Sequence, residues 1–254
     1  MGPYLSVVIP AYNEERRLPD TLRRVRDYLG RQSYASEILV VDDGSQDGTI
    51  VAAQQALAGL APNVAGRVIA NDHRGKGYTV RTGMLAAAGE IVLFTDADLA
   101  TPIEEVTKLI AALEAGYDVA IGSREGIGAQ RLAEPWYRHL MGRIFNLAVR
   151  IIAGMSYQDT QCGFKAFRRP AARDLFERMQ LYGAGAKQIK GNAVTAFDVE
   201  VLFLAGRRGY KAKEVPVIWR YGESTKVNPL RDSIRNFQDV VRVRLNDWRG
   251  AYRD

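Results

Sequence analysis

The chain has 254 residues, of which 47% are hydrophobic and 25% are charged, and it contains a single cysteine, Cys162. This length and composition are typical of one large globular domain, and they exclude a disordered, collagenous or disulfide-stabilised protein. One cysteine and two histidines also make a Cys/His zinc site unexpected. No apolar run of about 18 residues predicts a transmembrane helix, and no signal-peptide pattern opens the chain. A reducing, cytoplasmic setting is therefore expected.

Positive charge is concentrated at the C-terminal end. Residues 1–204 contain 23 basic and 23 acidic residues, whereas residues 205–254 contain 12 and 6 and so carry the whole net charge of +6. A basic end on a neutral body favours an anionic partner: nucleic acid, a phosphorylated substrate or an anionic membrane surface. The alternative is a solvated helix with excess arginines. Nucleic acid is the weakest of these hypotheses, because no recognised nucleic-acid-binding motif accompanies the charge.

Strands and helices alternate over the first half of the chain. Short apolar runs predict strands over 5–10, 38–41, 68–69, 91–94 and 119–121. Helical spacing of apolar residues predicts helices over 17–29, 47–57, 77–88 and 102–115. This alternation predicts an α/β fold with a mainly parallel, Rossmann-like sheet that is covered by helices. Ligands bind beyond the carboxyl ends of such strands, and polar segments follow four of the predicted strands there.

The second half of the chain has a different pattern. Residues 135–154 predict a long helix that mixes large apolar residues with arginines, which is typical either of a core helix or of a helix at a membrane interface. A Gly/Lys-rich loop is expected over 182–192. A helix over 196–207, a strand over 212–219 and a basic helix over 230–248 complete the chain.

Two acidic segments follow predicted strands. Asp96 and Asp98 are one residue apart at a strand end, where two carboxylates can bind a hard divalent cation together with diphosphate oxygens. The alternative is a pair of solvated carboxylates in a turn. Asp42 and Asp43 precede Gly44, so they could form a turn and helix cap, or accept hydrogen bonds from a base or ribose. Neither a complete P-loop nor a G-x-G-x-x-G segment is present, which excludes a P-loop NTPase and an NAD or FAD enzyme.

Nine segments form an ordered set along the chain: VVIPAYNEE (7–15), ILVVDDGSQDGT (38–49), GKGYTVRTGM (75–84), FTDADLATP (94–102), GSR (122–124), DTQCGFKAF (159–167), FDVE (197–200), EVPVIW (214–219) and STKVN (224–228). The first five resemble the family 2 glycosyltransferases with the GT-A fold. The last four resemble the polyprenyl-phosphate branch of that family, and they are more similar to dolichyl-phosphate β-glucosyltransferases than to dolichyl-phosphate mannose synthases.

The resemblance implies a nucleoside diphosphate sugar site and assigns its residues. They are Pro10, Tyr12 and Glu14 at the nucleotide, Val41 and Asp43 at the base and ribose, Asp96, Ala97 and Asp98 at the diphosphate and a Mg²⁺ or Mn²⁺ ion, and Lys226 at the donor diphosphate. Arg124 and Arg138 would meet the phosphate of the acceptor. Arginine forks fit phosphate in a bidentate manner, and lysine acts as a point charge.

The implied reaction is inverting transfer of a hexose, expected to be glucose from UDP-glucose, to a polyprenyl phosphate. GDP-mannose is the alternative donor, and a soluble hydroxyl acceptor is the alternative acceptor. An acceptor phosphate is already an anion and needs no strong base, so we expect Asp198 to bind sugar hydroxyls. Its alternatives are a catalytic base, which a hydroxyl acceptor would need, and a helix cap. A protein that only binds sugar nucleotides or membrane surfaces is a further alternative, which Asp96 and Asp98 disfavour.

The same resemblance implies one domain over 1–254, with a nucleotide-sugar half (1–124) and an acceptor and membrane half (125–254) that carries C-terminal acceptor-binding helices. We expect a peripheral enzyme at the cytoplasmic face of a membrane, with no nucleic-acid partner. Three departures from the family pattern stand out. The loop over 182–194 is longer than in the glucosyltransferase relatives. Ala100 occupies a position at which some relatives have a glutamine able to join the metal shell. The relatives also have membrane segments, whereas none is predicted in this chain.

Overall fold

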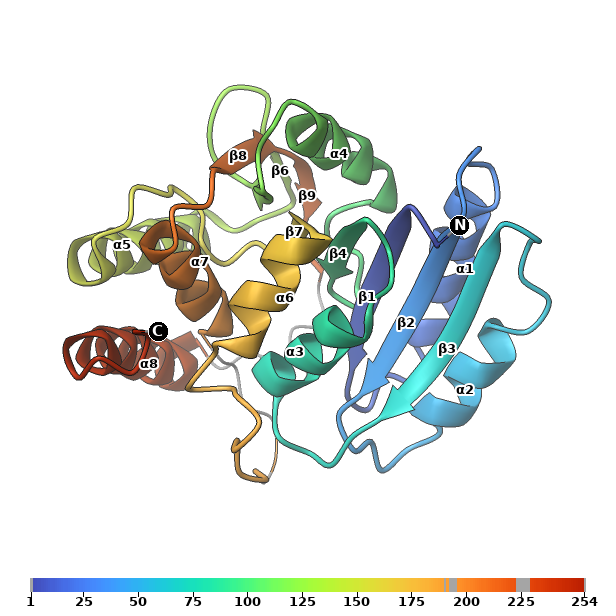
Figure 1. Cartoon of the computed structure of the whole chain (residues 1–254), viewed down its shortest axis with the longest axis horizontal. Coiled ribbons are helices and arrows are strands. Elements are labelled where there is room, and N and C mark those ends of the chain that lie inside the picture. Colours follow the sequence, from blue (N-terminus) through green and yellow to red (C-terminus); the bar gives the residue numbers. More distant parts are fainter. Residues whose placement is uncertain (1, 190, 192–195, 223–228, 254) are drawn as a thin grey trace.

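The computed structural model describes residues 2–189, 191, 196–222 and 229–253, without the side chains of residues 137, 138 and 229–233. A seven-stranded sheet forms its centre (Figure 1), with strand order β3-β2-β1-β4-β7-β5-β8. The strands are β1 (Leu5–Ala11), β2 (Ser36–Asp42), β3 (Val64–Ala70), β4 (Ile91–Thr95), β5 (Val119–Ser123), β7 (Phe164–Arg168) and β8 (Ala212–Pro216). All of them run parallel except β7, which is antiparallel to both β4 and β5. The expected α/β fold with a mainly parallel sheet is confirmed.

Helices cover both faces of this sheet. One face packs against α1 (Leu18–Leu29), α2 (Thr49–Ala56) and α4 (Val106–Glu114), which follows a short 3₁₀ turn (Ile103–Glu105). The other face packs against α3 (Lys76–Ala86), α6 (Arg169–Glu177) and α7 (Phe197–Arg207). Alternate residues of each strand enter the two cores: Ile38 and Val40 of β2 face one, and Leu39 and Val41 face the other.

Two long helices lie outside this sandwich. They are α5 (Trp136–Ala153) and α8 (Pro229–Trp248), which pack side by side and against α7 (Figure 1). Each contributes small or aliphatic side chains to the core, such as Val149 and Val243. Among the described residues, no helix combines the length and apolarity needed to cross a membrane.

Several elements differ from those predicted. The strand expected over 212–219 is divided into β8 and β9 (Ile218–Arg220), and β9 pairs with β6 (Gln130–Leu132) in a separate two-stranded sheet. No strand was expected at β7, where Lys165 interrupts the apolar residues, and no helix was expected at α6. β7 inserts between β4 and β5, so both halves of the chain build the same sheet. Residues 190 and 192 of the Gly/Lys-rich loop lie outside the described residues, as do the following residues 193–195.

Candidate active site

Hydrogen bonds join the loops that follow β1 and β2 at the carboxyl end of the sheet. The amide of Asn13 donates to Ser45 Oγ (2.9 Å), and the amide of Glu14 donates to Thr49 Oγ1 (2.8 Å). Asn13 has a φ of 52°, which few non-glycine residues adopt. Asparagine adopts this left-handed conformation more readily than most residues. The loop is a candidate for ligand contact because it lies beyond the carboxyl ends of parallel strands.

Asp43 and His73 form a polar cluster beside this loop. Asp43 Oδ2 lies 2.9 Å from His73 Nδ1, and the same carboxylate accepts the amides of Arg74 (2.9 Å) and Gly75 (3.0 Å). The imidazole of His73 stacks on the ring of Tyr12, with centroids 4.1 Å apart and planes within 3° of each other. Asp43 therefore braces the turn that leads into α3, and its contact with a base or ribose stays a prediction.

Two of the residues expected at the nucleotide have buried side chains. Pro10 is buried in β1, and Val41 is fully buried in β2. Val41 packs beneath Gly83 of α3, where an added Cβ would come within 2.8 Å of Val41 Cγ2. Val41 is therefore a core residue, and its expected contact with a base or ribose stays a prediction.

The D-x-D segment follows β4 and is held in place from two sides. The amide of Asp96 donates to the carbonyl of Gly163 (3.2 Å), and Thr21 Oγ1 of α1 donates to the carbonyl of Ala97 (2.5 Å). A Cβ on Gly163 would overlap the carboxylate of Asp96. This glycine therefore leaves the space in which the first aspartate sits.

Asp98 places a second carboxylate in the same segment. Its Oδ1 accepts the amide of Ala100 (3.0 Å), and the intervening Leu99 has a φ of 45°. Burial raises the pKa of Asp98, and the negative charge of Asp96 raises it further. Two carboxylates that oppose each other's ionisation favour a bound cation.

Lys76 brings an ammonium group to this carboxylate pair. Its Nζ lies 2.5 Å from Asp96 Oδ1 and 5.9 Å from the centre of the Phe197 ring. Burial lowers the pKa of Lys76, but the negative charges of Asp96 and Asp198 outweigh burial, so that the pKa is raised. Lys76 is the first residue of α3, and the helix start therefore delivers a fixed positive charge to the D-x-D segment.

A second lysine–aspartate pair is buried between β7 and α7. Lys165 Nζ donates to Asp198 Oδ1 and to the carbonyl of Cys162, each at 2.5 Å. Burial raises the pKa of Asp198, although the charge of Lys165 opposes that rise. Ala196 occupies the N-cap position of α7. Asp198 therefore lies inside the helix, and its carboxylate pairs with Lys165 instead of capping the helix.

A bidentate ion pair holds Arg124 at the end of β5. Its Nε lies 2.7 Å from Asp159 Oδ2 and its Nη2 lies 2.8 Å from Asp159 Oδ1, while its guanidinium lies 5.3 Å from the Trp219 ring centre. Burial would raise the pKa of Asp159, but the charge of Arg124 outweighs burial and holds that pKa well below its usual range. A bound phosphate would therefore share Arg124 with Asp159.

Two of the expected phosphate ligands cannot be placed. Lys226 lies outside the described residues, and Arg138 belongs to α5 but its side chain is not described. The described residues bring Tyr12, Glu14 and Asp43 to the ends of β1 and β2, and they place Asp96, Ala97 and Asp98 at the end of β4. The ligand contacts of all these residues stay predictions.

The sequence model of the family "Glycosyl transferase family 2" matches residues 6–176 of the chain. The chain belongs to the family 2 glycosyltransferases. It is 36% identical to a dolichyl-phosphate β-glucosyltransferase of Drosophila melanogaster and 31% identical to one of Homo sapiens, each over 98% of this chain and 77% of the relative. The predicted family resemblance is thereby confirmed.

A solved structure shares the fold of this glycosyltransferase. Glucosyl-3-phosphoglycerate synthase from Mycobacterium tuberculosis, in complex with uridine diphosphate, superposes with a TM-score of 0.64 at 21% identity. The match covers 95% of this chain and 80% of that one. It supports the expected GT-A architecture.

The two aspartates of the D-x-D segment are suitable ligands for a divalent metal ion, and they form an open site with two carboxylates. Asp96 and Asp98 supply hard oxygen ligands, and Asp96 already holds a cation, the ammonium of Lys76. In the described part of the chain, no three His, Cys, Asp or Glu side chains form a preformed metal cage. Oxygen atoms of the donor and water would therefore have to complete the coordination.

Four residues at or beside this site were not expected as site residues: His73, Lys76, Asp159 and Lys165. Lys76 belongs to the segment Gly75–Gly77, which is too short for a P-loop. Lys165 stands among Phe164, Ala166 and Phe167 in β7, and a charge between apolar residues is the signal that could have identified it. Asp159 and His73 carry no comparable signal, since their partners come from distant parts of the chain.

Proposed function

We propose that this family 2 glycosyltransferase transfers glucose from UDP-glucose to a polyprenyl phosphate. One observation carries the proposal: relatives that match almost the whole chain at 31–36% identity, from Drosophila melanogaster, Homo sapiens and Saccharomyces cerevisiae, are all dolichyl-phosphate β-glucosyltransferases. The chain covers 77% of each of these relatives.

Charge neutralisation and positioning suffice for this chemistry. The acceptor phosphate is an anion at neutral pH, so the nucleophile needs no strong general base. Asp96 and Asp98 would hold Mg²⁺ or Mn²⁺, which when bound supplies positive charge to the leaving nucleoside diphosphate. Lys76, whose raised pKa keeps it charged, adds a second positive centre beside Asp96, and Lys226 is proposed to bind the diphosphate.

Two arginines are proposed to align the attacking phosphate. Arg124 is held by Asp159, and this pairing fixes the guanidinium before the acceptor arrives, which lowers the entropic cost of positioning. Arg138 in α5 is its proposed partner. Asp198, held by Lys165, is proposed to bind sugar hydroxyls. In-line attack on an α-linked donor then gives a β-linked product.

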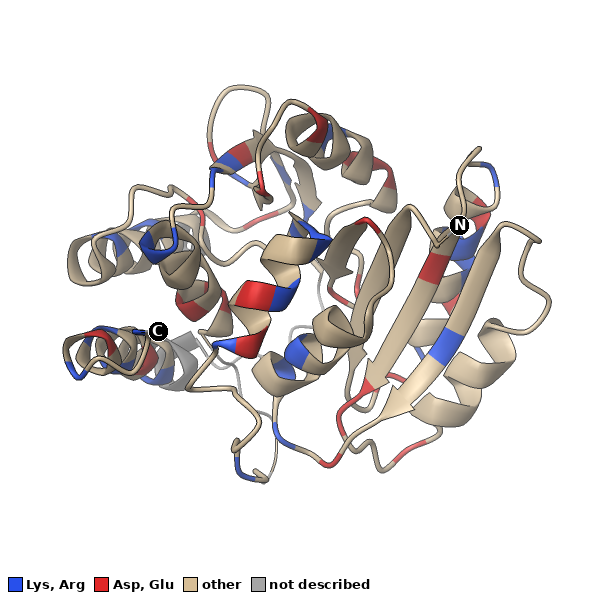
Figure 2. Cartoon of the chain, in the orientation of Figure 1, with Lys and Arg blue, Asp and Glu red and all other residues tan. Residues whose placement is uncertain are grey.

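A polyprenyl acceptor requires the enzyme to work at a membrane surface, and α5 offers the contact. Its exposed apolar residues recur at spacings of three or four and therefore share one helix face: Trp136, Leu140, Ile144, Leu147 and Ile151. The neighbouring α8 exposes Ile234, Phe237, Leu245 and Trp248. Basic residues occur along both helices (Figure 2), as expected of helices that lie in an anionic interface. We propose peripheral attachment at the cytoplasmic face.

A donor panel tests this proposal. Purified protein is incubated with UDP-glucose, GDP-mannose or other nucleotide sugars, with Mg²⁺ or Mn²⁺ and a short polyprenyl phosphate, and lipid-linked sugar is quantified. We expect product from UDP-glucose and none in EDTA. Product from a different donor alone, or transfer only to a water-soluble hydroxyl acceptor, would overturn the proposal.

A further inference from the structure

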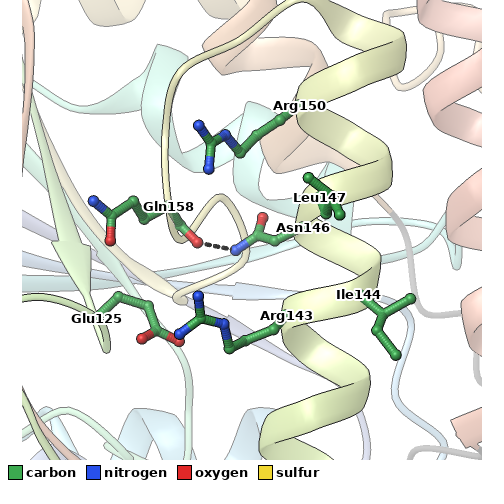
Figure 3. A pocket seen from close by; sticks show the side chains of 7 residues that line it. All are labelled: Glu125, Arg143, Ile144, Asn146, Leu147, Arg150 and Gln158. Carbon is green, nitrogen blue, oxygen red and sulfur yellow. Dashed lines mark hydrogen bonds between the residues drawn. The ribbon is translucent and has the colours of Figure 1, made fainter.

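A cavity of about 400 Å³ lies between α5 and the segment around Gln158 (Figure 3). Arg143, Asn146 and Arg150 line it from α5, and Glu125 and Gln158 line it from the body of the protein. None of its lining residues belongs to the candidate active site. Its volume is within the range of small-ligand sites, roughly 300–1,000 Å³.

Hydrogen bonds fix the wall of this cavity. Asn146 Nδ2 donates to the carbonyl of Gln158, and Thr160 Oγ1 donates to Asn146 Oδ1 (3.0 Å). Glu214 in turn accepts the amides of Gln158 (2.9 Å) and Asp159 (2.8 Å). The amide of Asn146 is therefore occupied in fastening α5 to the body, and the cavity is built into a fixed frame.

Two arginines flank that fastening and face the cavity. Arg143 and Arg150 lie one turn before and one turn after Asn146, and all three side chains extend toward the same side of the helix (Figure 3). Within the described part of the chain, neither guanidinium forms a hydrogen bond or an ion pair. The nearby acid Glu125 is already paired with Arg131 Nη2 at 2.7 Å. Two uncompensated guanidinium groups on one cavity favour an anion, most of all a phosphate.

The same cavity borders the apolar face of α5. Ile144 and Leu147 complete its lining, and they are 62% and 55% exposed as members of the apolar stripe described above. In Figure 3 both extend away from the Gln158 side of the helix. A ligand that satisfies both surfaces carries a phosphate on one end and hydrocarbon on the other.

We infer that this cavity binds the headgroup phosphate of an anionic membrane phospholipid, with Arg143 and Arg150 as its ligands. The inference rests on the proposed function, because a lipid acceptor is what brings the enzyme to a bilayer. The occupant is a bilayer phospholipid and not the reacting polyprenyl phosphate, because Arg124, which is proposed to align the reacting phosphate, does not line this cavity. One bound headgroup would fix how α5 lies on the membrane.

Vesicle flotation tests this inference. Wild type and the double variant Arg143→Gln/Arg150→Gln are mixed with vesicles of phosphatidylcholine, with and without phosphatidylglycerol. The variant should bind the phosphatidylglycerol vesicles roughly 10-fold more weakly or worse, since each basic residue at an anionic surface contributes substantially to attachment. The control Arg31→Gln/Arg173→Gln removes equal charge from exposed positions on α6 and after α1, and should bind within about twofold of wild type.

A charge-conserving variant separates a headgroup site from diffuse attraction. Arg143→Lys/Arg150→Lys keeps both charges but loses the bidentate fork, so we expect binding between that of wild type and the glutamine variant. Binding equal to wild type would show diffuse attraction alone and would overturn the inference. Two further results would overturn the inference. The glutamine variant could lose binding only to vesicles that contain polyprenyl phosphate, or light scattering could show that this variant disrupts a dimer.

Activity in detergent distinguishes this inference from the proposed function. With detergent-dispersed polyprenyl phosphate, the glutamine variant should transfer glucose at the wild-type rate, because neither Arg143 nor Arg150 is among the residues proposed to bind the donor or the acceptor. A comparable loss of activity and of vesicle binding would place the arginines in the acceptor site and overturn the inference. If wild type transfers no glucose, the proposed function is contradicted. The vesicle experiment would then still decide whether the cavity binds a phospholipid headgroup.

Discussion

Paired opposite charges are the main feature of the candidate site at the scale of single residues. Lys76 contacts Asp96, and Lys165 contacts Asp198, each at 2.5 Å. Lys165 and Asp198 are buried, and burying either charge alone would be very costly, whereas a pair with further hydrogen bonds is tolerated. Lys76 and Asp96 are about one third exposed, so solvent reaches that pair. Each pair therefore holds in place a carboxylate with a proposed ligand, the metal ion for Asp96 and the sugar for Asp198.

Replacing the second aspartate tests the metal site. Asp98→Asn should lose most turnover and most metal-dependent donor binding, because an amide is a poorer ligand than a carboxylate for a hard cation. Calorimetric titration of UDP-glucose with and without Mn²⁺ measures the binding. Asp27→Asn, at an exposed position on α1, is the matched control. Full activity of Asp98→Asn, or of wild type in EDTA, would contradict the assignment.

The Arg124–Asp159 pair predicts a pH-dependent contribution to stability. Asp159→Asn should lower the free energy of unfolding by about 3 kcal/mol at neutral pH, because Arg124 loses its partner. The pKa of Asp159 is depressed in the folded protein, so this contribution is present above the unfolded pKa of about 3.9 and is lost as the pH falls below it. Urea unfolding at several pH values should show the difference between wild type and variant shrinking below about pH 4. A difference that is constant with pH would contradict the pairing.

The positions of site residues that directly follow a predicted strand could be predicted from the sequence. Contacts between residues far apart in the sequence could not. Asp96 and Asp98 follow an apolar strand, so their place at the sheet edge could be predicted. The apolar run over 38–41 likewise predicted that Val41 is buried. The close approach of α3 to β2 at Gly83 could not be predicted, because it joins residues far apart in the sequence. The pairing of Lys165 with Asp198 depends on β7 entering the sheet between β4 and β5.

At the scale of elements, α5 combines a core contact with an exposed apolar face. Val149 and Ala153 are buried, whereas Trp136 and Ile151 are 78% and 73% exposed. The periodicity predicted the helix, with observed bounds Trp136–Ala153. Whether it was a core helix or an interfacial one could not be decided from periodicity, because both require the same apolar spacing.

Arg138 in this helix provides a functional test. Arg138→Ala should weaken the use of polyprenyl phosphate far more than donor binding, by about 1.5–3 kcal/mol for a lost charged hydrogen bond. Arg138→Lys should restore only part of it, because the bidentate fork is lost. The apparent affinity for polyprenyl phosphate is compared with the calorimetric donor affinity. Equal losses of both, or no loss of either, would identify Arg138 as a structural residue.

At the scale of the whole molecule, the carboxyl end of the sheet, where the donor site is proposed, and the helices α5 and α8 are built on the same fold. β7 and β8 come from the second half of the chain and complete the sheet begun by the first, while α5 and α8 pack on α7 beside it. The proposed donor site and the proposed membrane surface are thus built on the same frame. The concentration of basic residues at the C-terminal end fits an anionic surface better than nucleic acid, because exposed apolar residues accompany it.

The linkage of the product tests the central claim most directly. Purified protein is given UDP-glucose, a divalent metal ion and a short polyprenyl phosphate, and the anomeric configuration of the lipid-linked sugar is measured by NMR. Direct displacement by an acceptor phosphate predicts a single β-linked glucosyl phosphate. An α-linked product, or free glucose with no lipid-linked sugar, would contradict it.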